Sequence, residues 1–183
     1  MRYTFYIFLI IVGLASCQTE VVDINVLEAA MNSIPVETSK NIEIIYSDSA
    51  IVRAKLTSPH LDNYKVENPY NEMPEGLTVL FYTPELEIES TLTANYGIRY
   101  IDQGVVEVKD NVIVVNKKGE KLNTERLLWD ENTKRIFSDN FVKITTKEEI
   151  ILGEGFESDQ NFSSYKIFKI KGTISIADSA FSD

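Results

Sequence analysis

Few residues in this 183-residue chain are suited to catalysis, because it has one cysteine, Cys17, and one histidine, His60. A Ser/His/Asp triad would need His60 as its base, and His60 lies in the proline-rich stretch 59–74, which we expect to be a long loop. The sequence has no G-x-S-x-G motif and no zinc-ligand spacing. We therefore expect His60 to be a solvated loop residue, and we predict a protein that is not an enzyme and uses no cofactor.

An acidic segment, "DENTKR" from Asp130 to Arg135, begins like a calcium-binding loop with the pattern D-x-N-x-K. Arg135 stands at the sixth position, where such loops need glycine for a sharp turn. The segment is therefore predicted to be a solvated turn without a metal. Trp129, just before it, is expected to be a packing residue at the rim or core and not a platform for stacking a sugar.

Cys17 ends the N-terminal stretch "MRYTFYIFLIIVGLASC", in which one arginine precedes an apolar run from Phe5 to Ala15. Eleven residues at about 1.5 Å each are too short for a bilayer core of roughly 30 Å, so residues 1–16 are predicted to be a signal peptide. The last four residues, "LASC", resemble the bacterial lipobox, in which a peptidase cleaves before a cysteine that carries acyl chains. We expect Cys17 to be the lipidated mature N-terminus; the alternative is an ordinary signal peptide with a coincidental cysteine.

The charge balance limits the partners, since 18 basic and 28 acidic residues give a net charge of −10. Nucleic-acid binding depends on basic residues that neutralise phosphates, so no nucleic-acid partner is expected. An acidic protein is also repelled by an anionic membrane surface. Lipidation, and not charge, is therefore predicted to hold the protein at a membrane, with the inner membrane favoured over the outer one.

Short strands are predicted almost everywhere after Lys40. Runs such as "GLTVLFYT", "NVIVVN" and "YKIFKIKGTISI" alternate apolar and polar residues and are bounded by Gly, Asn or Asp. We expect a lipidated tether over residues 17–40 that offers one short helix, a β domain over 41–177 and a C-terminal tail over 178–183. Strands at such spacing predict an all-β sandwich, barrel or solenoid.

A repeat selects among these folds, because "DNVIVVNKKGEKLNTERLLWDEN" from Asp110 resembles "DNFVKITTKEEIILGEGFESDQN" from Asp139 after a shift of 29 positions. Leu122 and Thr124 share one parity, whereas Leu127 and Trp129 share the other. A residue must be skipped near Glu125 and Arg126, as a bulge or corner would do, for all four side chains to face inward. The fold predicted is an open β-jellyroll, a folded-over antiparallel sheet of stacked short strands.

The apolar positions that coincide under the shift are predicted to line the interior of this jellyroll. They are Ile113, Val115, Leu122, Leu127, Val142, Ile144, Ile151 and Phe156. The interior could be a filled core, but small residues among the large ones leave room for a lipid. They are Ser90, Ala94, Thr124, Gly153 and Gly155.

Several stretches together resemble the LptC family, the periplasmic component of lipopolysaccharide export, in its Bacteroidetes lipoprotein form. The most specific are "GEKLNTERLLWDENTKRIFSD", "GEGFESD" and "IKGTISI", and the similarity runs from about Asn41 to Ile176. The resemblance implies a bridge that accepts lipopolysaccharide from an inner-membrane ABC transporter into an apolar groove and passes it to a periplasmic β-jellyroll partner. Many family members are held by a spanning helix, which the lipobox replaces here.

Two other functions stay open from the sequence alone: a structural envelope lipoprotein with a filled β-repeat domain, or a different jellyroll component of the same machine. For the bridge, the segment from Tyr165 to Ile176 is predicted to be a half-buried edge strand that templates the next jellyroll. Its docking residues are predicted to be Phe168, Ile170, Thr173 and Ile174.

Overall fold

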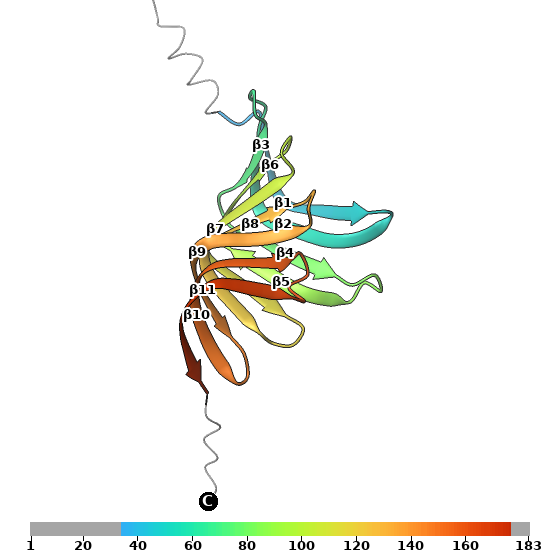
Figure 1. Ribbon diagram of the computed structural model, residues 1–183. Helices are drawn as coiled ribbons and strands as arrows, with labels where there is room; N and C mark the ends of the chain where they lie inside the picture. The colour runs from blue at the N-terminus through green and yellow to red at the C-terminus, as the bar shows by residue number, and fades with distance from the viewer. Residues whose placement is uncertain (1–33, 177–183) are drawn as a thin grey trace, which may run out of the picture. The chain divides into compact units, whose positions relative to one another are not determined.

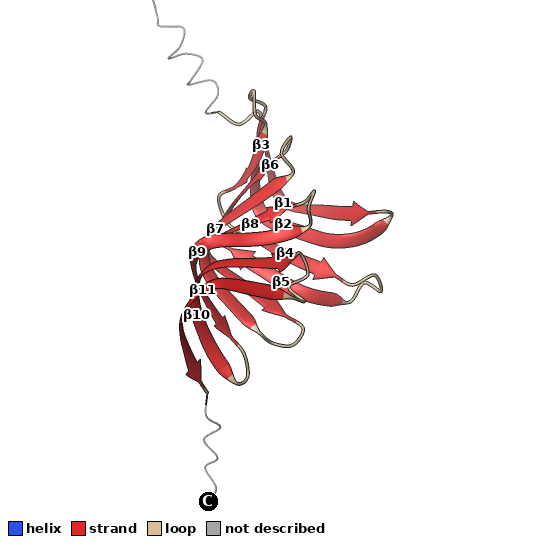
Figure 2. Ribbon diagram, viewed as in Figure 1, coloured by secondary structure: helices blue, strands red, loops and turns tan. Residues whose placement is uncertain are grey.

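The computed structural model describes residues 34–176 as one compact unit built from eleven β-strands. Among these residues there is no helix, and so none able to cross a membrane (Figure 2). Cys17, the predicted signal peptide and the predicted tail lie outside the described residues. The strands are β1 (Glu37–Asp48), β2 (Ile51–Tyr64), β3 (Tyr70–Met73), β4 (Leu77–Tyr82), β5 (Ile88–Ala94), β6 (Tyr96–Tyr100), β7 (Val105–Asn116), β8 (Lys121–Asp130), β9 (Arg135–Thr145), β10 (Glu149–Asp159) and β11 (Tyr165–Ser175).

All eleven strands belong to one antiparallel sheet, which confirms the predicted all-β jellyroll (Figure 1). The order is β11-β10-β9-β8-β7-β5-β4-β2-β3-β6, with β1 beside β2 and an additional pairing of β6 with β7. β1 pairs only with β2, and β11 pairs only with β10. Within residues 34–176 these two strands are therefore the free edges of the sheet. β1 begins at Glu37, inside the segment predicted to be tether.

The sheet folds over because its long strands change partners half-way along. In β2, residues 54–57 pair with β4 and residues 62–64 pair with β3. In β7, residues 105–109 pair with β6 and residues 113–116 pair with β5. Each long strand thus contributes one half to each of two layers, and the inner sides of both halves pack into a single apolar cluster.

The bends occur where the backbone enters the left-handed region. Asn41 in β1, Asp110 and Asn111 in β7 and Gly155 in β10 have φ between 51° and 79°. Asn, Asp and Gly tolerate this region better than other residues do. At the bend of β7, two residues lie opposite Glu125 alone, because Lys109 pairs with Arg126 and Val112 with Thr124. The predicted skip near Glu125 is therefore present as a bulge.

The 29-residue repeat corresponds to two successive bent hairpins, β7–β8 and β9–β10, but the shift is not constant along it. Leu122 pairs with Val114 in the first hairpin, and Ile151 pairs with Ile144 in the second. Leu122 and Ile151 are 29 positions apart, whereas Val114 and Ile144 are 30 apart. The turn between β7 and β8 is one residue longer than the turn between β9 and β10, which accounts for the difference.

The stretch 59–74 is not the long loop that its three prolines predicted. β2 continues to Tyr64, and β3 follows after a short turn. Pro59 lies between Thr57, the last residue that pairs with β4, and Asp62, the first that pairs with β3. Proline is tolerated there because the strand changes neighbours and fewer backbone amides are needed for the ladder.

Candidate functional site

A row of apolar side chains crosses the inner surface of the sheet from one free edge almost to the other. Each member is the cross-strand partner of the next, from β1 through β10. We call this set the inner row: Ile44, Leu56, Val79, Leu92, Val114, Leu122, Ile144 and Ile151. Its last member, Ile151 of β10, pairs with Thr173 of the edge strand β11, so the apolar row stops one strand before that edge. The eight residues span seven strand spacings of about 4.8 Å, so the row is roughly 34 Å long, longer than one leaflet of a hydrocarbon core of about 30 Å.

Aromatic rings form a second feature, the aromatic ladder, between the two layers. The ladder consists of Tyr46, Trp129, Phe81, Phe162, Phe156 and Tyr165, in that order. Successive ring centroids lie 5.4, 5.3, 6.2, 6.1 and 5.9 Å apart. These distances are typical of edge-to-face and offset-stacked pairs. The ladder begins on β1 and ends on β11, so it also connects the two free edges.

The centre of the interior is closed, whereas its ends are partly open. A cavity of about 20 Å³ remains beside Val114, Leu122 and Phe156, which is room for about one water molecule. Ile44 at one edge and Ile151 at the other are only half-buried. The small residue Gly153 leaves no space either, because a Cβ atom there would lie 2.4 Å from the Ile167 side chain. The small interior residues therefore do not create an open groove in this state.

Six of the eight predicted groove residues lie on the inner side. Leu122, Leu127, Val142, Ile144 and Phe156 are buried in the core, and Ile151 packs against it half-buried. The prediction is wrong for Ile113 and Val115, which are cross-strand partners of Asn123 and Lys121 on the opposite side of β7. Val115 is 38% exposed. In this half of β7 the inner residues are Val112 and Val114, each one position before the residue that the repeat predicted.

The C-terminal strand is an edge, as predicted, but it is not half-buried. Phe168, Ile170, Thr173 and Ile174 are all exposed, and Tyr165 and Ile167 are the residues that pack against the core. The register between β10 and β11 shifts near Lys171, because Gly153 pairs with Ile170 while Leu152 pairs with Gly172. The expected alternation along β11 is interrupted by this bulge. Its lysines are solvated, and Lys171 lies 3.4 Å from Glu154.

A charged cluster holds the bend of the central strands. The Arg126 guanidinium donates to Glu107 at 2.5 Å and to Asp139 at 3.1 Å, and Lys109 lies 3.1 Å from Glu107. Burial alone would raise the pKa of Glu107, but the bonds from Arg126 and Lys109 hold that pKa below its usual value. On the inner side, the Thr124 hydroxyl donates to the Phe141 carbonyl at 2.9 Å. The bend is thus fixed from both sides.

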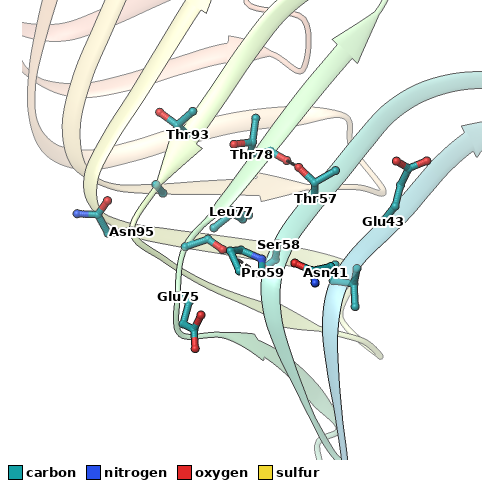
Figure 3. Close-up of a pocket in the computed structure, with 13 residues that line it drawn as sticks. Asn41, Glu43, Thr57, Ser58, Pro59, Glu75, Leu77, Thr78, Thr93 and Asn95 are labelled. Carbon is teal, nitrogen blue, oxygen red and sulfur yellow. Dashed lines mark hydrogen bonds between the residues drawn. The ribbon is translucent and has the colours of Figure 1, made fainter.

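An open hollow of about 620 Å³ lies at the bend of β1, β2, β4 and β5, and both polar and apolar residues line it (Figure 3). Thr57, Thr78 and Thr93 form one cross-strand row there, on the opposite side of the sheet from the inner row. Its charged residues are Glu43 and Glu75. The threonine row and the two carboxylates make it less suitable for an acyl chain than the inner row is.

His60, next to this hollow, lies in β2 and not in a loop. Its Nδ1 is 3.1 Å from Glu75, and its Nε2 is 3.1 Å from Asp62. Hydrogen bonds to Glu75 and then to Asp62 raise the pKa of His60. Both carboxylates contact the ring, and Asp62 also accepts a hydrogen bond from the Thr38 hydroxyl at 2.6 Å. Among the described residues, no nucleophilic side chain completes a triad with His60. His60 therefore serves as a contact between β2 and the turn that precedes β4.

The segment from Asp130 to Arg135 is a turn, as predicted. The Asp130 carboxylate accepts hydrogen bonds from the amides of Asn132 at 2.8 Å and Thr133 at 3.0 Å. These bonds lower the pKa of Asp130. Trp129 is buried, in agreement with a packing role, and its Nε1 has no hydrogen-bond partner in the described part of the chain. No group of three potential metal ligands occurs within residues 34–176.

Among the interior residues that the periodicity did not predict are two rings of the aromatic ladder. Phe81 was included in a predicted strand but was not assigned to the interior, although its alternation with Val79 gives the correct side. Phe162 lies between strands, where alternation gives no information, and it has φ 54°. Its aromatic character in a segment of Asn and Ser is the one signal that could have indicated burial.

One comparison with known proteins gives a match. A family model described as "Lipopolysaccharide-assembly, LptC-related" matches residues 5–171. No curated protein matches the chain. The matched region includes almost all of the described β-sheet.

Proposed function

Because the chain belongs to the LptC-related family of lipopolysaccharide-assembly proteins, we propose that its interior receives lipopolysaccharide acyl chains during export. The family acts in lipopolysaccharide transport, in the periplasm and in association with the inner membrane. The inner row is the observation that supports the proposal most directly. It offers eight consecutive apolar side chains across a surface that is buried between two layers.

The cost of exposing acyl chains explains why such a surface is needed. Burying a methylene is worth about 0.8 kcal/mol, so a chain of a dozen carbons exposed to water costs on the order of 10 kcal/mol. A lipopolysaccharide has several such chains, which excludes free diffusion through the periplasm. An interior that runs from edge to edge lowers this cost along the whole path through the domain.

The two free edges support a place in a chain of proteins. Strand addition at an exposed edge joins two sheets through backbone hydrogen bonds. Partner sheets at β1 and β11 would place their own inner surfaces at the two ends of the inner row. In this proposal lipopolysaccharide arrives from the inner-membrane ABC transporter and leaves to a periplasmic β-jellyroll partner. The domain performs no chemistry on the lipid.

The proposed anchor is the acylated Cys17. Two or three acyl chains give stable membrane binding where one chain would be marginal. It would keep the domain near the transporter without a spanning helix. Mass spectrometry of the exported protein should find Cys17 at the N-terminus with added lipid mass; a different N-terminus without lipid would contradict the anchor.

A second function is favoured by the closed centre of the interior. A structural envelope lipoprotein would have a permanently filled core, and the small residual cavity beside Phe156 is what such a protein would show. The two functions differ in whether an acyl chain can enter between the layers.

The single tryptophan makes this entry measurable, because Trp129 lies in the aromatic ladder. A fatty acid brominated in mid-chain and kept below its micellar concentration should quench Trp129 fluorescence in the full-length protein, since bromine quenches on contact. The unbrominated fatty acid is the reagent control. In a matched protein with Trp129→Phe and Val115→Trp, the reporter lies on the outer side and should not be quenched. Absence of quenching at Trp129 in the wild type and in every folded variant would support the structural lipoprotein.

A further inference from the structure

Phe162 is the one member of the aromatic ladder that does not belong to a strand. It lies in the connection 160–164 between β10 and β11, which we call the Phe162 loop, and it is only 3% exposed. Its ring stacks on Phe156 of β10 and meets the edge of Phe81 of β4. The loop thus inserts an aromatic side chain between strands that are distant in the sheet order.

The ring occupies the middle of the proposed lipid path. Phe162 lines the small apolar cavity together with Val114, Leu122 and Ile144, three consecutive members of the inner row. Removing the ring would interrupt the ladder between Phe81 and Phe156 and would enlarge this cavity. The other five rings are held by strands, which cannot move without breaking ladder hydrogen bonds. The Phe162 loop lies outside the strand ladders, and its backbone bond to another part of the sheet is the one that the Gln160 amide donates to the Lys134 carbonyl at 3.0 Å.

The loop is also held less firmly than the strands beside it. Phe162 has φ 54°, a conformation that is unfavourable for a residue with a Cβ atom. The Gln160 side chain is buried, yet its Oε1 has no hydrogen-bond partner among residues 34–176. The contact from Asn116 Nδ2 to the Phe162 carbonyl is long, at 3.5 Å. The closed position of the loop therefore includes a strained backbone residue, a buried side-chain oxygen without a hydrogen bond and one long contact.

Hydrogen bonds at the start of the loop offset these costs. The Ser158 hydroxyl donates to the Ser164 carbonyl at 3.0 Å, and Asp159 makes several further bonds. The Asp159 carboxylate accepts a hydrogen bond from the Ser163 amide at 2.8 Å and a short one from the Ser163 hydroxyl. The Asp159 carbonyl accepts from the Phe162 amide at 3.1 Å. Asp159 lies at the end of β10, outside the aromatic ladder, so it determines the loop position without filling the interior.

From this geometry we infer that the Phe162 loop is a plug that closes the interior when no acyl chain is bound and leaves it when one enters. The inference rests on the proposed function and adds the element that controls access to the site. Apparent affinity falls with the fraction of molecules in the binding-competent state. Any change that destabilises the closed loop should therefore tighten acyl-chain binding.

Two variants of the full-length protein test the plug with the brominated fatty acid and Trp129 quenching. Phe162→Ala should bind about tenfold more tightly than the wild type, because it removes the competing ring. Asp159→Ala should bind severalfold more tightly although every interior side chain is retained. Phe141→Ala, which removes an exposed ring from β9, should bind like the wild type. Circular dichroism melting of each variant establishes that it is folded.

The outcomes separate the plug from the proposed function. Quenching in the wild type with no tightening in Asp159→Ala would overturn the plug alone, even if Phe162→Ala gained affinity through its new cavity. If neither the wild type nor either folded variant is quenched, acyl chains do not enter and both proposals fail. Quenching only in the two variants would support a plug that is tightly closed in the isolated protein. If Phe162→Ala does not fold, the result for Asp159→Ala decides.

Discussion

Val114 and Val115 are neighbours in β7 with opposite environments. Val114 is 2% exposed and pairs with Leu122 in the inner row, whereas Val115 is on the outer side. Strand neighbours always face opposite ways, so an error of one position reverses the assignment of every side chain. Single substitutions therefore measure how much each inner side chain contributes to the free energy of unfolding.

The two valines give a matched pair of substitutions. Val114→Ala should lower the free energy of unfolding by about 2 kcal/mol, since it removes two buried methylene equivalents and leaves a cavity. Val115→Ala should change it by about 0.5 kcal/mol or less. Urea denaturation followed by circular dichroism measures both. Equal losses in the two variants would show that the side assignment in β7 is incorrect.

His60 gives the stability a predictable pH dependence. Its pKa is raised in the folded state by Glu75 and Asp62, whereas the unfolded value is about 6.5. A raised pKa means that the folded state binds the proton more tightly. The contribution of His60 is therefore complete below about pH 6.5 and is lost as the pH rises through the higher folded-state pKa.

Replacing His60 with glutamine should remove this contribution. The wild type should melt at a higher temperature than His60→Gln at pH 5.5, and the difference should shrink by pH 8.5. Glu75→Gln is the control, because it removes the first cause of the raised pKa and should reduce the pH dependence. A difference between wild type and His60→Gln that is the same at both pH values would refute the assignment.

At the scale of elements, the sequence predicted strands and bends better than it predicted the connections between them. Alternation identified the inner sides of β8, β9 and β10 correctly, and the skip at Glu125 followed from a change of parity. The error in β7 arose because a one-residue difference in a turn is invisible to a fixed repeat. The continuation of β2 past Pro59 depends on a change of strand neighbours, and the burial of Phe162 depends on contacts with β4. Both are tertiary effects that periodicity does not contain.

The edge strand β11 presents amides for docking at defined positions. The Ile176 amide donates to the Glu148 carbonyl at 2.7 Å. Because hydrogen-bonded pairs alternate along an antiparallel ladder, the Ile174 amide points towards β10 and the amide of Thr173 points to the free edge. The sequence left open which of these two amides faces outward, and the register resolves it.

Proline at these two positions should have different effects. Thr173→Pro should abolish capture of the proposed periplasmic jellyroll partner and leave the melting temperature nearly unchanged, because it removes an outward amide. Ile174→Pro should lower the melting temperature, because it removes a ladder bond to β10. Pull-down of the partner and thermal melting measure the two effects. Unchanged capture by folded Thr173→Pro would move the docking site to β1.

At the scale of the whole molecule, one antiparallel sheet supplies both a shielded apolar surface and two free edges. The eight apolar members of the inner row come from eight different strands, so the surface exists only when the complete sheet has formed. Family membership assigns the protein to lipopolysaccharide transport. The central proposal is that lipopolysaccharide acyl chains lie along the inner row.

Photocrosslinking in cells tests that proposal most directly. A photoreactive amino acid is placed at Val114 or Ile144 of the inner row, and at the adjacent outer positions Val115 or Lys143 as matched controls. We predict that lipopolysaccharide is captured from the two inner positions and not from the two outer ones. Equal labelling at inner and outer positions, or no labelling at folded, expressed inner variants, would contradict transport through the interior.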